Sequence, residues 1–292
     1  MPKPIICTSP YLRTTKATKG IAKALISALG ELNVEHMELT HTNDYWCRDY
    51  MPVCLFEDGS YSLYEYRPDY LWGKDKYRKY ITNQNEVCKE LNLFIPTDMQ
   101  IIFDGGNYVR CDNKVIMTDK VFMENSQWPT HLLIQHLHEA LCSEIIFLPW
   151  DMNEPFGHSD GMVANLGNGR LLLNNYSQTI KKYEIPYYKR LLKILQPHFE
   201  IVELTYDCKP ERDSWCYLNY LRVPNGILLP CLSENALCDN DQAALETFSK
   251  LFPDKQIVPI YAKPLLKHGG ALHCVTWEYY KNERQEDVRK II

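Results

Sequence analysis

Apolar positions along the chain follow two spacings, one with the period of a helix and one that alternates as in a strand. Near the beginning, Ile21, Leu25 and Leu29 mark a helix over residues 18–32 with one buried face. A strand, a polar loop and a β-hairpin that turns at Asp58-Gly59 follow in that order. Their expected bounds are 36–39 for the strand, 46–52 for the loop, and 53–56 with 62–66 for the hairpin.

The same order of helix, strand, loop and hairpin recurs along the rest of the chain. The later helices are expected at 74–91, around Leu133 to Leu141, around Leu191 to Leu195, and at 241–252. The later strands are expected at 99–103, 144–148, 201–204 and 257–261, and the hairpins turn at 112–113, 167–169 and 224–226. These antiparallel hairpins argue against an all-parallel doubly wound sheet, which is the alternative for such a chain.

One polar residue or cysteine in each loop marks a repeat of about 55 residues. The markers are Asp49, Asp104, Asp160, Asn219 and Cys274. Each lies between the first strand and the hairpin of its unit. If the five units surround a common axis, their loops converge on one end of it and form a single central site.

Length and composition agree with one globular domain over residues 1–292. The chain is 45% hydrophobic with a net charge of −5 and a pI of about 6.0, so it has no basic footprint for nucleic acid, and its mild acidity is compatible with a cationic ligand. No apolar run approaches the roughly 20 residues of a membrane span, and the first residues lead into a short strand instead of a signal peptide. We therefore expect a cytoplasmic protein that binds no membrane.

Eleven cysteines in a chain of this length are expected to be reduced thiols. The sequence has no Cys-x-x-Cys pair, and we expect Cys88, Cys142 and Cys231 to be small core residues. His136, His138 and Cys142 lack the second histidine of a zinc-protease helix, so they are assigned to an ordinary amphipathic helix. No metal or cofactor is expected.

The segment His268 to Thr276 contains the strongest candidate for a nucleophile. Cys274 comes soon after Gly269-Gly270 in a segment that is expected to be a strand, where the backbone can approach a ligand closely. Potential partners lie in the other loops, since acidic residues, an imidazole and an amide recur there. A thiol in such company is suited to nucleophilic catalysis.

These motifs resemble those of the agmatine deiminase and bacterial-type peptidylarginine deiminase family. The matching segments are Trp46-Cys47-Arg48-Asp49 with Pro52, Asp104-Gly105-Gly106, Gly157-His158-Ser159-Asp160, Ser214 to Asn219, and Gly269 to Thr276. The resemblance covers residues 44–276 in order and spacing. It implies the α/β pentein fold, a five-bladed α/β propeller of five pseudo-symmetric ββαβ units around a central active site, and it implies guanidine-modifying chemistry.

A guanidinium is planar and poorly electrophilic, so its hydrolysis needs a strong nucleophile and groups that hold and polarise the cation. A thiolate and two carboxylates, each accepting two N–H bonds, meet that need. The resemblance assigns Cys274 as the nucleophile and Asp49 and Asp160 as the carboxylates. It assigns His158 as the acid that protonates departing ammonia and the base that then activates water.

Other residues are candidates for the substrate-binding wall. Asp104 stands where the family usually has Glu, and its shorter side chain is expected to alter what the site accepts. Asn219 and Glu154 are candidates for lining the pocket, and Trp46 for a cation–π wall. Arg48 is expected to be a structural ion-pair partner. His273 is expected to support the site from the opposite face of a strand.

The expected partner is a small cationic guanidino substrate, with agmatine as the first choice and peptidyl-arginine or free arginine as alternatives. Met51 and His268 depart from the family pattern near the pocket. Two other functions remain open. An amidinotransferase on the same scaffold would pass the amidino group to an amine, and a non-catalytic guanidinium-binding protein would bind without turnover. The sequence is compatible with a homo-oligomer but does not specify one.

Overall fold

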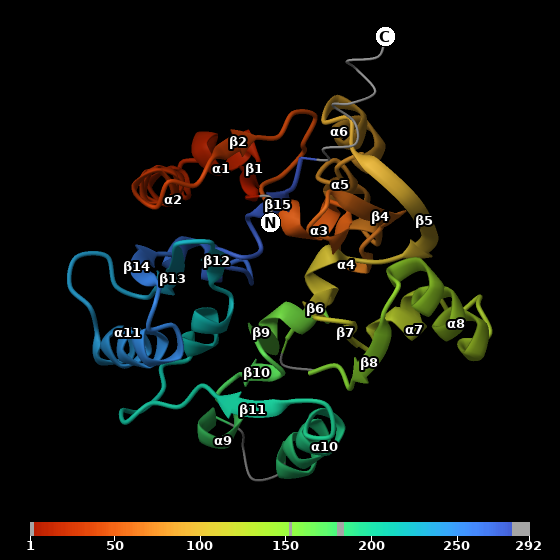
Figure 1. Cartoon of the computed structure of the whole chain (residues 1–292). Helices are drawn as coiled ribbons and strands as arrows, with labels where there is room; N and C mark the ends of the chain where they lie inside the picture. Colours follow the sequence, from red (N-terminus) through yellow and green to blue (C-terminus); the bar gives the residue numbers. More distant parts are fainter. Residues whose placement is uncertain (1–2, 152–153, 180–183, 282–292) are drawn as a thin grey trace. The chain divides into compact units, whose positions relative to one another are not determined.

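The computed structural model describes residues 3–151, 154–179 and 184–281. In these residues, fifteen strands form five three-stranded sheets (Figure 1). Each sheet contains an antiparallel pair whose central strand also pairs in parallel with a third strand. The parallel pair needs a crossover connection, which the intervening helix supplies. Each sheet is therefore one ββαβ unit, as the repeat in the sequence predicts.

Two compact units divide the chain. The first comprises 1–105, 124–142 and 274–292, and the second 106–123 and 143–273. The sequence-based expectation of one domain over residues 1–292 stays a prediction.

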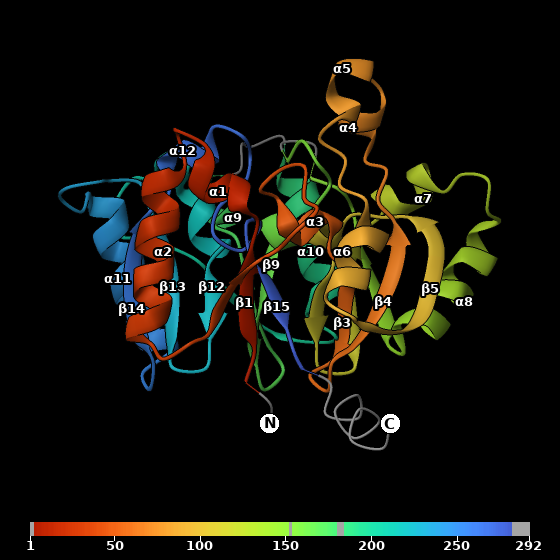
Figure 2. The ribbon, with the colours of Figure 1, turned by 90° about the horizontal axis from the view of Figure 1, so that it is seen from above.

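The first unit contains two sheets, β15-β1-β2 and β3-β4-β5. Its strands are β1 (Ile5–Thr8), β2 (His36–Glu38), β3 (Val53–Phe56), β4 (Ser60–Glu65), β5 (Phe94–Ile102) and β15 (Trp277–Tyr279). Its helices are α1 (Pro10–Thr14), α2 (Lys19–Glu31), α3 (Cys47–Tyr50), α4 (Asp69–Trp72), α5 (Asp75–Arg78), α6 (Gln84–Glu90) and α8 (Thr130–Leu141). Figure 2 shows β3, β4 and β5 side by side.

The second unit contains the sheets β6-β7-β8, β9-β10-β11 and β12-β13-β14. Its strands are β6 (Val109–Cys111), β7 (Lys114–Thr118), β8 (Glu144–Leu148), β9 (Val163–Gly167), β10 (Arg170–Leu173), β11 (Glu200–Glu203), β12 (Leu221–Val223), β13 (Gly226–Cys231) and β14 (Gln256–Tyr261). Its helices are α9 (Tyr176–Thr179), α10 (Ile185–Leu195), α11 (Asp239–Leu251) and α12 (Lys263–Leu266), with the 3₁₀ turns η2 (Ser159–Gly161) and η4 (Ser214–Leu218). Helix α7 (Lys120–Glu124) and the 3₁₀ turn η1 (Gly105–Asn107) lie where the chain passes between the units.

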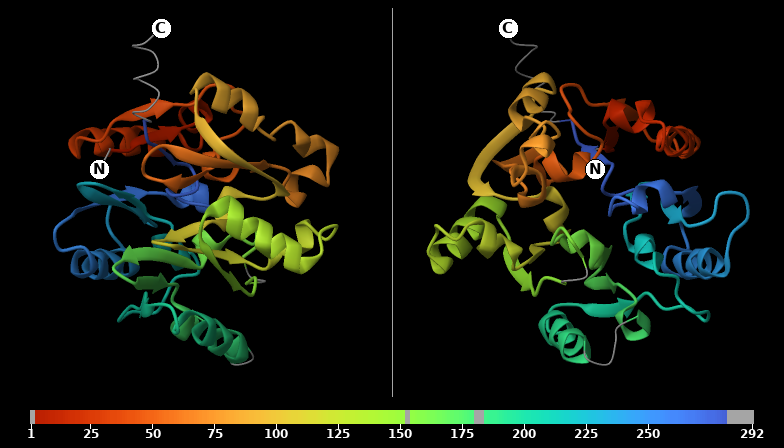
Figure 3. Two further views of the ribbon diagram at one scale, coloured as in Figure 1. Left: turned by 45° about the vertical axis from the view of Figure 1, so that its right-hand side comes forward. Right: turned by 180° about the vertical axis from the view of Figure 1, so that it is seen from behind.

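Helix α2 illustrates how the apolar stripe builds an element. It buries Ile21, Leu25 and Leu29 with Ala22 and Ala28, and burial of each large aliphatic side chain contributes roughly 1.5–3 kcal/mol. The helix ends at Glu31, and Asn33 then adopts a left-handed conformation with φ of 55°. Helix α11, drawn in blue in Figure 3, likewise buries one face, with Ala244 and Phe248, and it lies against β14.

Most expected elements occur where the sequence predicts them, and three do not. The single helix expected at 74–91 is two short helices, α5 and α6, separated by residues 79–83. Residues 267–276 form turns after α12 instead of the expected strand. Residues 47–50 of the expected first loop form the helical turn α3.

Ten of the eleven cysteines are buried or half-buried, and Cys142 is exposed. All eleven are free. Cys88 and Cys231 are buried as predicted, but Cys142, which follows the last residue of α8 with a left-handed φ of 50°, is exposed. The prediction of a core role for Cys142 was wrong. Separately, no helix among the described residues is both long enough and apolar enough to cross a membrane.

Candidate active site

Three of the predicted site residues lie buried in the first unit. Asp49 is in α3, Asp104 follows β5, and Cys274 precedes β15, with exposed fractions of 7%, 2% and 6%. The backbone N–H of Arg48 donates to the carbonyl oxygen of Cys274 at 3.2 Å. This bond joins the Trp46–Asp49 motif to the segment that carries the thiol.

Tyr64 and Gly105 hold the loops of Asp49 and Asp104 together. The Tyr64 hydroxyl donates to the carbonyl oxygens of Asp49 at 2.5 Å and Met51 at 2.8 Å, and it lies 2.8 Å from the place of a Cβ atom on Gly105. A Cβ atom at Gly105 would lie 2.1 Å from the carbonyl oxygen of Arg48. Glycine is therefore required because two backbones touch at this position.

Several acidic groups act electrostatically on one phenol in this unit. The pKa of buried Tyr66 is raised well above its usual value, first by burial and then by Asp44, Asp49 and Asp104. The Tyr66 ring packs edge-on against Tyr50, with centroids 6.0 Å apart. The charges of acidic groups from two of the motifs therefore act on one buried phenol.

Asp44 fixes the start of the Trp46–Asp49 motif. Its Oδ1 accepts the backbone N–H of Trp46 at 2.9 Å, and its own carbonyl oxygen accepts the Tyr50 hydroxyl at 3.3 Å. Burial raises the pKa of Asp44 to about 7, and the bond from Trp46 lowers it in part. The Trp46 ring is half-buried beside Tyr45, with centroids 4.8 Å apart.

In the second unit, Asp160 and Asn219 belong to one hydrogen-bond network with His273. The Asp160 Oδ2 atom lies 2.7 Å from His273 Nδ1 and accepts from Asn219 Nδ2 at 3.3 Å. The Asn219 Oδ1 accepts the N–H of Ala271 at 3.0 Å, and its carbonyl oxygen accepts the N–H of His273 at 3.1 Å. Asn219 therefore orders the three residues that directly precede Cys274 in the sequence.

His158 lies in a loop that Glu154 organises. Glu154 accepts the backbone N–H of His158 at 2.8 Å and that of Phe156 at 3.1 Å. Burial raises the pKa of Glu154, and His158 lowers it in part. Gly157 has φ of +74°, and a Cβ there would lie 2.4 Å from the Lys120 side chain, so glycine is required before His158. His158 itself is 5% exposed.

The structure thus groups the predicted residues in two sets, one in each unit. Asp49, Asp104, Cys274 and Trp46 belong to the first, and His158, Asp160, Asn219 and Glu154 to the second. Their convergence on a single site, and the catalytic and substrate-binding roles assigned to them, stay predictions. Among the described residues, no group of three or more His, Cys, Asp or Glu is arranged to hold a metal ion.

Two expectations about neighbouring residues were refined. Arg48 forms an ion pair, as predicted, and the structure identifies its partner as Glu278, at 2.7 Å. His273 supports the site through Asp160, yet it lies in a turn, so its expected place on a strand face was wrong.

Sequence reasoning did not identify Tyr64 and Asp44 as residues that order the site. Tyr64 was one of several tyrosines in 61–66, and because β4 is buried on both faces, the pattern does not single out one of them. Asp44, two residues before Trp46, carries the spacing of a turn in which a side-chain oxygen accepts the N–H two residues on. That spacing was the available signal.

Comparisons with known proteins identify the family of this chain. The family model described as Porphyromonas-type peptidyl-arginine deiminase matches residues 8–279. A Legionella pneumophila (strain Paris) protein, named provisionally as an agmatine deiminase, is 26% identical over 220 residues, which is 67% of this chain. The chain spans 60% of the length of that relative.

Two further relatives extend the match. The agmatine deiminase of Pseudomonas putida (strain KT2440) is 22% identical over 300 residues, covering 85% of this chain and 77% of the relative. The solved structure of the Enterococcus faecalis agmatine deiminase superposes with a TM-score of 0.69 at 16% identity, covering 96% of this chain and 94% of the other. The superposition shows that this chain has the same α/β fold, with its five ββαβ units, as predicted.

Proposed function

Because the chain belongs to the Porphyromonas-type peptidyl-arginine deiminase family, we propose that it is a guanidine deiminase that converts agmatine and water to N-carbamoylputrescine and ammonia. The observation that carries this proposal is the family match over residues 8–279, which spans all five marker loops from Asp49 to Cys274. No cofactor takes part in the proposed reaction.

In the proposed mechanism, Asp49 and Asp160 hold the guanidinium by paired N–H bonds and fix its plane. The Cys274 thiolate attacks the central carbon and forms a C–S bond. The tetrahedral intermediate expels one nitrogen as ammonia after His158 donates a proton to it. An amidino-thioether remains on Cys274.

Water completes the reaction. His158, now neutral, removes a proton from a water molecule that attacks the amidino-thioether carbon. The C–S bond breaks and regenerates the thiolate, and the product carries a ureido group. Asn219 and Glu154 act as positioning residues in this scheme, since their side chains accept the backbone N–H groups of Ala271, three residues before Cys274, and of His158.

Agmatine is the first choice of substrate because it carries two positive charges. Asp49 and Asp104, whose charges act on the same buried phenol of Tyr66, favour a dication over free arginine, whose own carboxylate they repel. We expect kcat/KM for agmatine to exceed that for arginine by at least about tenfold, a difference of about 1.4 kcal/mol. An arginine-containing peptide is the third substrate to compare.

The test is ammonia release from these three substrates by the wild type and by Cys274→Ala. We expect the variant to lose at least about a thousandfold in kcat, because no other thiol replaces the nucleophile. Cys142→Ala is the matched control, since it removes an exposed thiol and should leave the rate unchanged.

Absence of ammonia release from every guanidine would reject the deiminase proposal. In that case the assay is repeated with an acceptor amine. A new guanidine product would identify an amidinotransferase, whereas tight agmatine binding without any product would identify a guanidinium-binding protein.

A further inference from the structure

Residues 67–80 form a cationic, aromatic arm between β4 and α6. They contain Arg67, Lys74, Lys76, Arg78 and Lys79 against Asp69 and Asp75, a net charge of +3. The chain as a whole carries −5, so the remainder carries −8. The arm is therefore a concentrated positive charge on an acidic protein.

The arm adds little to the core. Its two helices, α4 and α5, have four residues each and contain no buried residue. Within the first unit, Figure 2 shows them standing beyond the end of the β3-β4-β5 sheet. Helices this short gain little stability by themselves, so their packing does not explain the composition of the arm. Its anchor is Tyr70, whose hydroxyl is buried.

The exposed face of the arm pairs cations with aromatic rings. The guanidinium carbons of Arg67 and Arg78 lie 5.4 Å and 4.8 Å from the centroid of Trp72. The ammonium groups of Lys76 and Lys79 lie 4.7 Å and 5.0 Å from the rings of Tyr77 and Tyr80. Trp72 remains 44% exposed and Tyr80 40% exposed. Exposed Trp, Tyr and Arg are the residue types enriched where proteins bind one another.

A complementary surface lies in the second unit of the chain. Asp207, Glu211, Glu234 and Asp239 are exposed there and form what we call the acidic patch, together with Leu237, which is 38% exposed. Hydrogen bonds of 3.0 Å from Asn240 Nδ2 to the carbonyl oxygen of Lys209, and from the Glu211 N–H to Asn240 Oδ1, bring its two segments together. The cations Lys209 and Arg212 lie within the same segment.

We propose that the arm docks on the acidic patch of a second copy of this chain. Charge complementarity favours this partner, because a remainder of −8 attracts the arm of another copy. The same charge disfavours a nucleic acid, which the bulk of the chain repels. Each such contact uses the arm of one copy and the patch of the other.

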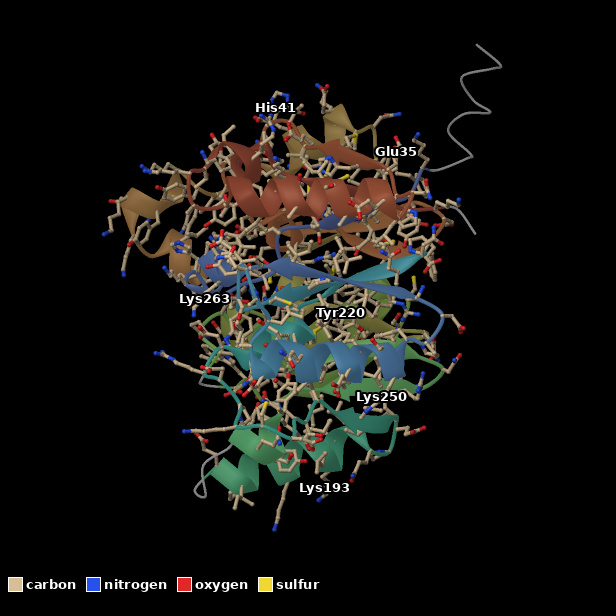
Figure 4. All side chains as sticks on the ribbon, turned by 90° about the vertical axis from the view of Figure 1, so that its left-hand side faces the viewer. Glu35, His41, Lys193, Tyr220, Lys250 and Lys263 are labelled. Atoms are coloured by element: carbon tan, nitrogen blue, oxygen red, sulfur yellow. The ribbon has the colours of Figure 1, made fainter. Side chains whose placement is uncertain are left out.

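Sedimentation velocity at increasing protein concentration tests the proposal. At about 50 mM salt the wild type is expected to form dimers, and at about 500 mM salt the dimers should dissociate, because exposed charges are screened. Reversing the arm with Lys74→Glu and Lys79→Glu should raise the dissociation constant by at least about tenfold. The matched control reverses two exposed lysines on α10, Lys189→Glu with Lys193→Glu, and should leave it unchanged; Figure 4 labels Lys193.

A charge exchange identifies the partner surface. The variant Glu211→Lys with Glu234→Lys should also fail to self-associate, and mixing it with the arm-reversed variant should restore heterodimers by pairing reversed arm with reversed patch. Circular dichroism confirms that each variant is folded. The proposal is overturned if the wild type is monomeric at both salts, if arm reversal leaves association unchanged, or if the mixture stays monomeric. It is also overturned if the arm instead binds a labelled single-stranded RNA and the proteins do not associate.

Discussion

At Gly105, the addition of a single methyl group should have a large structural effect. A Cβ atom there would meet the Arg48 carbonyl oxygen at 2.1 Å and the Tyr64 hydroxyl at 2.8 Å. The first contact is with backbone, so it cannot be relieved by a rotamer change. The loops that carry Asp49 and Asp104 would have to separate.

We therefore expect Gly105→Ala to destabilise the protein by about 1–3 kcal/mol, as overpacking does, which would be seen as a lower midpoint in thermal unfolding. Gly20→Ala is the control, because Gly20 lies in α2 with nothing within 4 Å of an added Cβ. Alanine there should stabilise the helix by roughly 0.5–1 kcal/mol. Equal midpoints for the two variants would contradict the packing argument.

Asp44 should give the stability a distinctive pH dependence. Its folded pKa of about 7 lies above its ordinary value of 3.8, because burial disfavours the charged form. Between these values the folded state binds more protons than the unfolded state, so the stabilising effect of protonated Asp44 is present below pH 3.8 and is lost as the pH rises to 7. Asp44→Asn removes this titration.

Urea unfolding of the wild type and Asp44→Asn across this range provides the measurement. The unfolding free energy of the variant minus that of the wild type should increase as the pH rises from about 4 to about 7. Above that range it should be constant. Asn retains a side-chain oxygen for the Trp46 N–H, so the loop is not disrupted. A difference that is constant through the whole range would show that Asp44 has an ordinary pKa.

Among the elements, α11 depends on a buried carboxylate at its beginning. Asp241 accepts the Tyr217 hydroxyl at 2.8 Å, the Leu232 N–H at 2.8 Å and the Ser233 N–H at 3.1 Å. These bonds outweigh burial and lower the pKa of Asp241. The carboxylate thereby joins α11 to the end of β13 and to η4.

Asp241→Ala should destabilise the fold by at least about 3 kcal/mol, because it leaves several buried donors without an acceptor. Glu246→Ala on the same helix is the control, since Glu246 is exposed and its loss should change stability by no more than about 0.5 kcal/mol. Chemical denaturation of both variants makes the comparison. Similar denaturation midpoints would show that the Asp241 network contributes little.

The elements also show what sequence patterns resolve. Leu133 and Leu137 mark α8, and Asn168 between two glycines marks the turn of the β9-β10 hairpin, because helical period and left-handed turns leave local signatures. The break between α5 and α6 was missed because α5 has no buried stripe. The available signal was Asn83, which begins α6 by accepting the Asn85 N–H with its side chain. The turn around Cys274 was likewise missed. Its shape depends on Asn219, which is distant in sequence.

On the scale of the whole molecule, the sheet β15-β1-β2 joins the two ends of the described chain. Ile6 pairs with Glu278 in the antiparallel ladder and with His36 in the parallel one. The repeat in the sequence predicts five units but shows only four hairpin turns. In the structure, the fifth antiparallel pair is formed by β15 and β1, which come from the two ends. Only pairing between strands far apart in sequence completes that unit.

Trp277 is the residue on which this closure depends most. It is 2% exposed, its Nε1 donates to the Pro52 carbonyl oxygen at 2.9 Å, and its ring lies 5.1 Å from that of Tyr61. Trp277→Ala should cost about 3–5 kcal/mol, as is usual for a buried Trp. Trp72→Ala is the control, because Trp72 is 44% exposed.

Hydrogen exchange shows where that loss acts. In Trp277→Ala the amides of β1 and β2 should exchange much faster than in the wild type, because β15 no longer covers the edge of β1. The amides of β13 and β14 pair within their own sheet and should be protected for longer. Unchanged protection in β1 would mean that α2 alone holds the strand. In that case, the fifth unit would be complete without the C-terminal strand.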